Sequence, residues 1–198
     1  MKKILIVSLF AAASFCMEAA DPFFRVDFNS GKDQIVLIPE KNDSMNAEPM
    51  GWVKDPEARK YTLTTWAKQK VPATEWKDYS ISFLASSSGS VNVTIGAQWA
   101  KKPEDRRWLL VNELKLNDKL YKNGDFREVR KSKDGRMIPV GFWLAKDARY
   151  LPNAGDKASP AILVNHDNRL YMTLKVEAGK RYKLTFEVKA PSGAEIRK

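Results

Sequence analysis

The stretch "DYSISFLASSSGSVNVTIGAQW", residues 78–99, decides the fold class. Between residues 78 and 85 the apolar side chains of Tyr, Ile and Phe alternate with Ser, and between residues 91 and 95 Val and Ile alternate with Asn and Thr. A period of two with one apolar side is typical of half-buried antiparallel strands. The Ser-rich segment 86–90, which contains a Gly, predicts a turn between them.

The same alternation recurs along most of the chain. Further strands are predicted at residues 23–28, 34–40, 60–68, 107–117, 161–166, 169–176 and 182–190. Turn-forming residues at 166–169 and 177–181 separate the last three strands, and no segment has the pattern of a long helix. Many short strands with one apolar side predict an all-β fold, a two-layer antiparallel β-sandwich.

The first residues have the layout of a secretory signal peptide. Two lysines precede an apolar run from Ile4 to Ala13, and small residues follow. The run is too short to span a bilayer. We expect residues 1–20 to be the signal and the exported protein to start near Asp21, in the periplasm or outside the cell. The alternative is a lipoprotein anchored at Cys16, which the bulky residue before it disfavours. Without Cys16 the mature chain has no disulfide.

The chain is strongly basic, with a formal net charge of +10 at pH 7. Such a balance favours anionic partners, namely acidic glycans, lipid head groups or nucleic acid. Export argues against nucleic acid, and no transmembrane segment is expected in the mature chain. The other interpretation is that the charge serves solubility alone.

Two pairs of segments within the chain resemble each other. They are "GWVKDPEARKY" (51–61) with "GFWLAKDARY" (141–150), and "VPATEWKDYSISFLASSSG" (71–89) with "VEAGKRYKLTFEVKAPSG" (176–193). Either the chain holds two related halves, 21–118 and 119–198, or the similarity arises by chance between strands. The second half has about four strands, which is few for an independent sandwich. We therefore expect residues 21–198 to form one domain.

Several phrases resemble a known family of modules. "KNGDFREV" (122–129), "PVGFWLAK" (139–146) and "LYMTLKVEAGKRYKLTFEVKA" (170–190) are similar, in order, to the N-terminal half of galactose-binding-like jelly rolls. This family includes the carbohydrate-binding modules attached to cellulases and xylanases. Residues 75–99 and 108–116 resemble the later strands of the same modules, so the two halves stand here in permuted order.

The resemblance implies a jelly-roll sandwich that binds carbohydrate and needs no cofactor. Such modules often hold a structural calcium ion near the first and last strands. The matching positions here are Asp125 and either Asn112 or Glu113. Arg127 replaces the glutamate that the family places after the Phe, and a cation there opposes a calcium ion. We therefore assign no metal ligands.

The sequence carries no readable catalytic motif, and we expect no enzymatic activity and no catalytic residue. His166 is the only histidine, and no nucleophile-elbow pattern flanks any serine. There is no Gly-rich phosphate loop and no HExxH motif. Glycoside hydrolysis needs only two carboxylates across a cleft, but no pair stands out. A hydrolase or lyase is the third interpretation of the function, after a carbohydrate-binding module and a protein-interaction module.

Aromatic side chains are the best candidates for contact with a ligand, because an exposed ring can stack on the apolar face of a sugar. The chain has six Trp and six Tyr residues. The predicted ligand-binding residues are Trp99, Trp108, Arg107, Tyr150 and Tyr171. By contrast, we expect Trp76, Trp143 and Tyr182 to lie in the core.

These features predict a secreted, non-catalytic carbohydrate-binding or cell-surface module. Two basic runs, 101–107 and 127–136, flank Trp99 and Trp108 on one side and Trp143 on the other. If they lie at the same end of the sandwich, the expected ligand is an acidic polysaccharide. The alternative function is a structural or protein-interaction module of the cell envelope that binds no sugar.

Overall fold

The computed structural model describes most of the chain after residue 22. The described residues are 23–31, 33–38, 40–41, 43–46, 61–102 and 105–197, together with the backbone of 52–54. The predicted signal and Cys16 lie outside these residues, as do positions 51 and 55–60 of the first similar segment. About 50% of the chain is strand and 6% is helical, and the predicted all-β sandwich is confirmed. No helix in the described part is long and apolar enough to cross a membrane.

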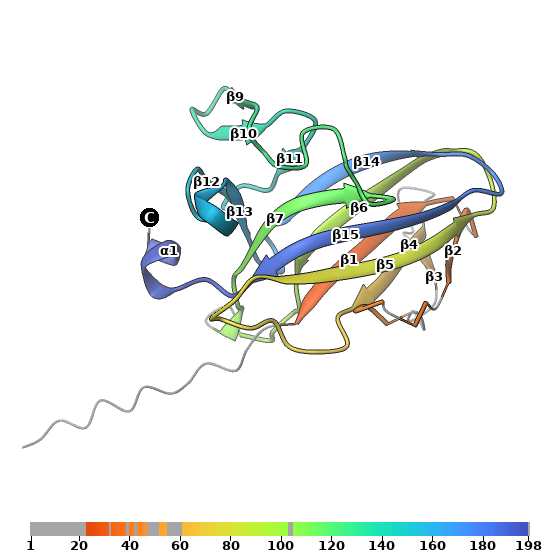
Figure 1. Cartoon of the computed structure of the whole chain (residues 1–198), viewed down its shortest axis with the longest axis horizontal. Coiled ribbons are helices and arrows are strands. Elements are labelled where there is room, and N and C mark those ends of the chain that lie inside the picture. Colours follow the sequence, from red (N-terminus) through yellow and green to blue (C-terminus); the bar gives the residue numbers. More distant parts are fainter. Residues whose placement is uncertain are drawn as a thin grey trace, which may run out of the picture.

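One layer of the sandwich is a six-stranded antiparallel sheet (Figure 1). Its strands, in spatial order, are β11 (Trp143–Leu144), β14 (Leu170–Val176), β6 (Gly89–Ala97), β1 (Phe24–Ser30), β4 (Tyr61–Trp66) and β3 (Trp52–Lys54). The predicted alternation holds on β1, where Phe24, Val26 and Phe28 are fully buried.

The other layer is a seven-stranded antiparallel sheet, which lies in front in Figure 1. Its strands are β12 (Arg149–Leu151), β13 (Ala161–Val164), β7 (Leu109–Leu116), β15 (Arg181–Lys189), β5 (Lys77–Ala85) and β2 (Ile35–Ile38), with β8 (Lys119–Leu120) paired to β7.

Smaller elements complete the fold at its ends. β9 (Val129–Lys131) and β10 (Met137–Pro139) form a hairpin beside β11, as Figure 1 shows. A 3-10 turn at Asp156–Ala158 precedes β13, and a short helix α1 (Gly193–Arg197) follows β15. The sequence pattern did not predict the two- and three-residue strands, because elements this short show no period.

The two sheets pack face to face through aromatic rings. Phe24 on β1 contacts both Tyr79 on β5 and Phe186 on β15, with ring centroids 5.5 and 5.4 Å apart. Phe28 contacts Phe83 at 5.3 Å. Tilted and edge-on contacts at these separations are favourable beyond the area that they bury. One main hydrophobic core therefore lies between the layers.

Both sheets combine strands from before and after residue 119. β14 pairs with β6 so that Met172 is opposite Val93, and β15 pairs with β5 so that Leu184 is opposite Ile81. The segments 78–99 and 161–190, which the sequence predicted to share a core, are thus direct neighbours. Whether the halves arose by duplication stays a prediction.

The segments on either side of the turn at residues 86–88 belong to different sheets. β5 lies in the seven-stranded sheet and β6 in the six-stranded one, so the turn crosses between the layers. The polar side of β5 is also less exposed than its pattern indicates. Ser80 and Ser82 are buried because the Asp43 carboxylate accepts hydrogen bonds from both hydroxyls and from the Ser82 amide.

The phrase "NGDF", residues 123–126, forms a buried corner that holds the hairpin in place. The Asn123 amide donates to the carbonyls of Glu128 and Val140, and its Oδ1 accepts from the Glu128 amide. Phe126 is buried against Phe142, with ring centroids 5.2 Å apart in an edge-on arrangement. This packing fixes the chain just before β11 and so decides which side chains of β11 face outward.

Candidate functional site

Across β14, β6 and β1, part of the outer face of the six-stranded sheet carries uncharged polar and aromatic side chains. Strand alternation turns Tyr171 and Thr173 of β14, Asn92 and Thr94 of β6, and Asn29 of β1 to this face. The register places Thr173 opposite Asn92, and Asn92 opposite Asn29. Tyr171 is likewise opposite Thr94. These side chains form a continuous surface.

An open pocket of about 560 Å³ lies on this face. It is lined by Asn29, Asn92, Thr94, Trp143, Leu144, Tyr171, Met172 and Thr173. Its volume falls within the range of ~300–1,000 Å³ that is usual for ligand sites. Because the lining runs from β11 to β1, it spans about 14 Å at ~4.8 Å per strand. The pocket is therefore wider than a single sugar ring.

Two aromatic side chains form the wall of the pocket at its β11 end. Trp143 and Tyr171 are cross-strand neighbours, which brings their side chains close together. Trp143 is 65% exposed and Tyr171 is 38% exposed. The expectation that Trp143 lies in the core is wrong, because its neighbours Phe142 and Leu144 take the inward positions. No signal in the sequence marks Trp143 as outward, because residues 142–144 are all apolar and β11 has only two residues.

The floor of the pocket offers amides and hydroxyls held by their own hydrogen bonds. Thr173 Oγ1 donates to Asn92 Oδ1 at 2.8 Å, and Thr62 Oγ1 donates to Asn29 Oδ1 at 2.7 Å. Asn29 Nδ2 donates to Thr94 Oγ1 at 3.4 Å. Among the described residues, no protein acceptor takes a hydrogen bond from Asn92 Nδ2. This amide is therefore available to a ligand.

A cluster of charged residues continues the same face beyond the pocket. The buried Asp27 carboxylate accepts from Arg25 Nε and Arg169 Nη1, each at 2.8 Å, and from Thr64 Oγ1 at 2.7 Å. Arg169 reaches Asp27 by crossing Gly96, where an added Cβ would lie 3.2 Å from its side chain. This carboxylate therefore neutralises part of the charge of two guanidinium groups.

His166 lies in this cluster and is neutral at pH 7. Its Nε2 is 3.3 Å from Arg25 Nη1 and 3.2 Å from Arg169 Nη2. Because guanidinium groups only donate, Nε2 accepts, and Nδ1–H donates to Asp167 at 2.9 Å. Burial and the charges of Arg169, Arg25 and Arg106 lower the pKa of His166 to about 4. Among the described residues, the ring nitrogens of His166 hydrogen-bond to Arg25, Arg169 and Asp167.

Arg130, on the β9–β10 hairpin, lies at the rim of the pocket. Its guanidinium carbon is 5.0 Å from the centre of the Trp143 ring, a cation–π distance. Arg130 does not line the pocket, so it leaves the pocket side of Trp143 open. The hairpin is fixed by Arg136, which donates to the carbonyls of Ala145 and Lys146. The sequence pattern did not single out Arg130.

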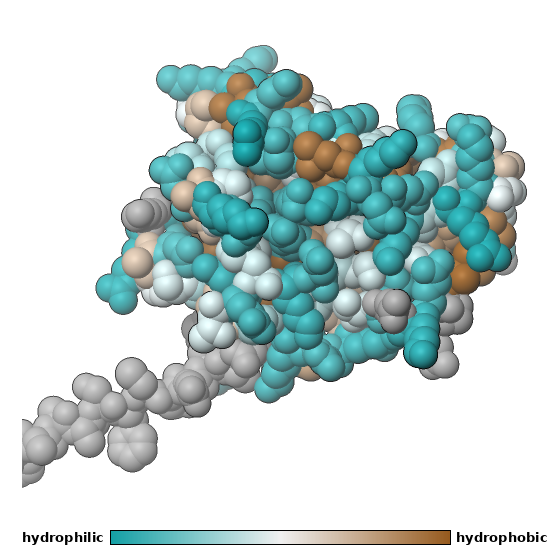
Figure 2. All heavy atoms as spheres, viewed as in Figure 1, coloured by the Kyte–Doolittle hydropathy of each residue, from teal (hydrophilic) through white to brown (hydrophobic). Residues whose placement is uncertain are grey.

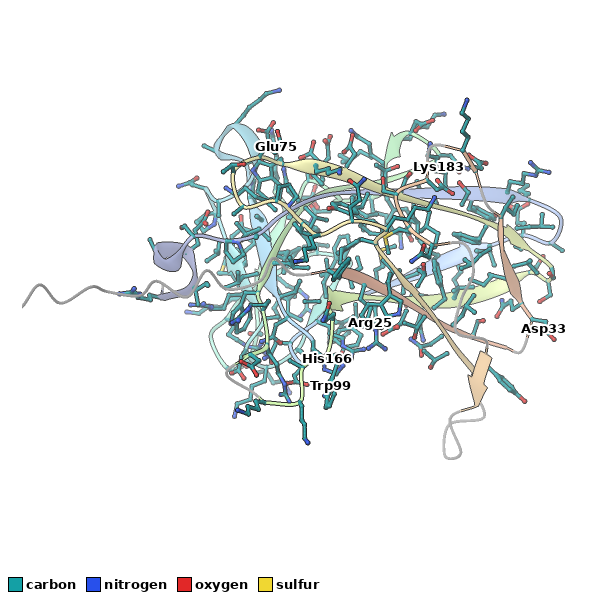
Figure 3. The ribbon with its side chains drawn as sticks, turned by 90° about the horizontal axis from the view of Figure 1, so that it is seen from below. Arg25, Asp33, Glu75, Trp99, His166 and Lys183 are labelled. Atoms are coloured by element: carbon teal, nitrogen blue, oxygen red, sulfur yellow. The ribbon has the colours of Figure 1, made fainter. Side chains whose placement is uncertain are left out.

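The structure separates the ligand-binding residues that the sequence predicted. Tyr171 lines the pocket, as its outward position on β14 indicated. Trp99 is 52% exposed and follows β6; it lies near His166, as Figure 3 shows, and does not line the pocket. The other three belong to the opposite layer or to the core.

Trp108 packs against a small apolar cluster on the outer side of the seven-stranded sheet, and Arg149 lies 5.8 Å from its ring centre. Tyr150 packs against the main core, and its burial raises its pKa. Arg107 is half-buried just before Trp108. These three residues therefore do not join Tyr171 in one site.

The positions that the resemblance suggests for calcium do meet in a second pocket of about 370 Å³. Asn112, Glu113 and Asp125 line it together with Glu187. However, Asp125 pairs with Arg127 at 3.2 Å, and Glu113 pairs with Lys115 at 3.0 Å. The described residues contain no group of three or more His, Cys, Asp or Glu side chains placed to hold a metal ion. The arrangement does not fit calcium.

One carboxyl group in this second pocket has a raised pKa. Burial, and the neighbouring Glu113 carboxylate, raise the pKa of Glu187 to about 7. Asn112 Nδ2 donates to Glu187 Oε2 at 2.8 Å. The Asn112 amide therefore holds one oxygen of this carboxyl group in place.

Comparisons with protein-family models, with curated proteins and with solved structures found no match for this chain.

Proposed function

We propose that this exported protein binds a polysaccharide chain on the outer face of the six-stranded sheet and catalyses no reaction on it. The observation that carries the proposal is the pair of exposed rings, Trp143 and Tyr171, beside an uncharged polar floor. Aromatic rings pack on the apolar faces of sugars, and amides and hydroxyls bond to their hydroxyl groups.

The width of the pocket favours a chain over a free monosaccharide. The floor crosses β14, β6 and β1, so a bound oligosaccharide has polar partners on three adjacent strands. Thr173 lies at the β14 side of the floor and Asn29 at the β1 side. The floor is held by bonds between side chains, so little ordering is needed when a ligand binds.

A glycan array probed with the purified protein tests the proposal. Trp143→Ala and Tyr171→Ala should each raise the Kd about tenfold or more, as loss of an aromatic anchor typically does. Trp143→Ala should keep the wild-type unfolding midpoint because Trp143 is 65% exposed, and Tyr171→Ala should lower it only slightly because Tyr171 is 38% exposed.

Trp99→Ala is the matched comparison, since this exposed tryptophan lies outside the pocket. If Trp99→Ala loses binding and Trp143→Ala does not, the site lies near residues 99–108 and the pocket is the wrong choice. If no glycan binds and Trp143→Ala loses a protein partner, the alternative function as a protein-interaction module is correct.

A further inference from the structure

The pocket has no negative charge of its own. Among the described residues that line it, none is Asp or Glu. The nearest carboxylate along the register is that of Asp27, opposite Thr94, and it is buried and bonded to two arginines and a threonine. A ligand carboxylate on this floor would therefore meet no exposed anion from the protein.

Beside the pocket, Arg130 and Lys175 make no ion pair with any carboxylate of the described residues. The ion pairs of the described residues include Arg25, Arg106 and Arg169, but neither Arg130 nor Lys175. Arg130 lies over Trp143, and the one bond of Lys175 within the described residues is to the Ser90 hydroxyl, at 2.7 Å. Their charges are available to a ligand.

The two cations differ in what they can recognise. The guanidinium of Arg130 presents a fork of N–H groups that matches a carboxylate in two parallel hydrogen bonds. Its contact with Trp143 holds it at the rim of the pocket, where it can reach a carboxylate that extends past the edge of that ring. Lys175 is a point charge on the outward side of β14, four residues from Tyr171 and about 13 Å along the strand.

We infer that the ligand is a polyuronate, a glycan whose sugars carry carboxylates, and that Arg130 binds the carboxylate of the sugar stacked on Trp143. Lys175 binds a second carboxylate farther along the chain. This inference rests on the proposed function. It goes beyond that proposal by naming the acidic group and the two residues that recognise it.

The test measures binding of polygalacturonate, alginate and hyaluronan, each beside its methyl-esterified form, which keeps the sugar backbone and removes the charge. The wild-type protein should bind at least one acid form more tightly than its ester. Arg130→Gln should raise the Kd for that acid form about fivefold, as for one exposed ion pair of ~1 kcal/mol, and leave the ester unchanged. Arg130→Lys should recover only part of the loss, because lysine cannot form the two-bond fork.

The matched control is Lys183→Gln, which removes one charge from the opposite layer. Figure 3 shows Lys183 on the other side of the sandwich from Arg25. This variant should bind like the wild type, which separates local recognition from the effect of total charge. Raising the salt concentration should weaken binding of the acid form more than that of the ester.

The two proposals fail in different ways. If Trp143→Ala weakens binding but Arg130→Gln does not, the sugar site stands and the polyuronate inference is wrong. If Trp143→Ala binds every acid form as the wild type does, the proposed function itself is wrong. Tighter binding of single-stranded DNA than of any polyuronate, lost in Arg130→Gln, would overturn the polyuronate inference in favour of nucleic acid.

Discussion

Replacing Asp27 by Asn should destabilise the protein more than any other single change at the outer face. The Asp27 side chain is 3% exposed and lies between Arg25 and Arg169, whose side chains are 17% and 20% exposed. An asparagine keeps one acceptor oxygen, which Thr64 and Arg25 can share. Its amide nitrogen would then face the Arg169 guanidinium, and because both groups are donors no hydrogen bond could form between them. Breaking a buried ion pair costs ~3–5 kcal/mol, and we expect about 3 kcal/mol because both guanidinium groups can turn toward water.

Urea unfolding followed by tryptophan fluorescence measures this loss. With a slope of ~2 kcal/mol/M, about 3 kcal/mol lowers the midpoint by about 1.5 M without changing the slope. The control is Asp167→Asn, whose carboxylate is 42% exposed and pairs with Arg106. That variant should lose at most ~1 kcal/mol, as exposed ion pairs do. A loss below 1 kcal/mol for Asp27→Asn, or equal losses for both variants, would refute the assignment of Asp27 as the centre of the cluster.

Two further predictions concern stability. The raised pKa of Glu187, about 7, means that the folded state holds a proton that the unfolded state has lost above pH ~4.5, so this group makes stability fall as pH rises from ~4.5 to 7. Glu187→Gln cannot repel Glu113, so the stability of this variant relative to the wild type should be higher at pH 8 than at pH 4. Urea unfolding at the two pH values measures this, and an equal stability difference at both would contradict it. Gly124→Ala should cost about 3 kcal/mol, because its Cβ would lie 2.2 Å from the Leu114 carbonyl oxygen. Gly31→Ala, whose Cβ would make only ordinary contacts, is the control, and similar unfolding midpoints for the two variants would show that the corner can shift.

The sequence predicted the strands because their alternation reflects burial directly. On β1 the residues of even number fill the core, and on β14 the outward position of Tyr171 followed from buried Leu170 and Met172. Each strand's pattern is local, so it can be read without knowing its neighbours. The order of strands in each sheet is not local, and the sequence did not predict that β5 and β6 would separate into different layers.

The site was only partly predictable, because it depends on contacts between distant segments. Asp27 and Arg169 are 142 residues apart in the chain and meet only because β14 and β1 both flank β6. Trp143 lies on a strand of two residues, too short to show which side is buried. Arg130 reaches it from a neighbouring hairpin. Tyr171 was identified because it lies on a long, regular strand.

The two outer faces of the sandwich carry different side chains, and folding alone does not account for the difference. The outward positions of β15 include Arg181, Lys183, Glu187 and Lys189. Figure 2 shows that side largely covered by hydrophilic residues. Charged side chains suit a surface that needs only to stay in water. The pocket instead exposes rings and uncharged amides and hydroxyls on equally regular strands, where charged residues would serve the fold as well. Exposed aromatic surface gives no solubility and little stability, and the presence of two exposed rings beside this pocket is the reason for proposing a ligand there.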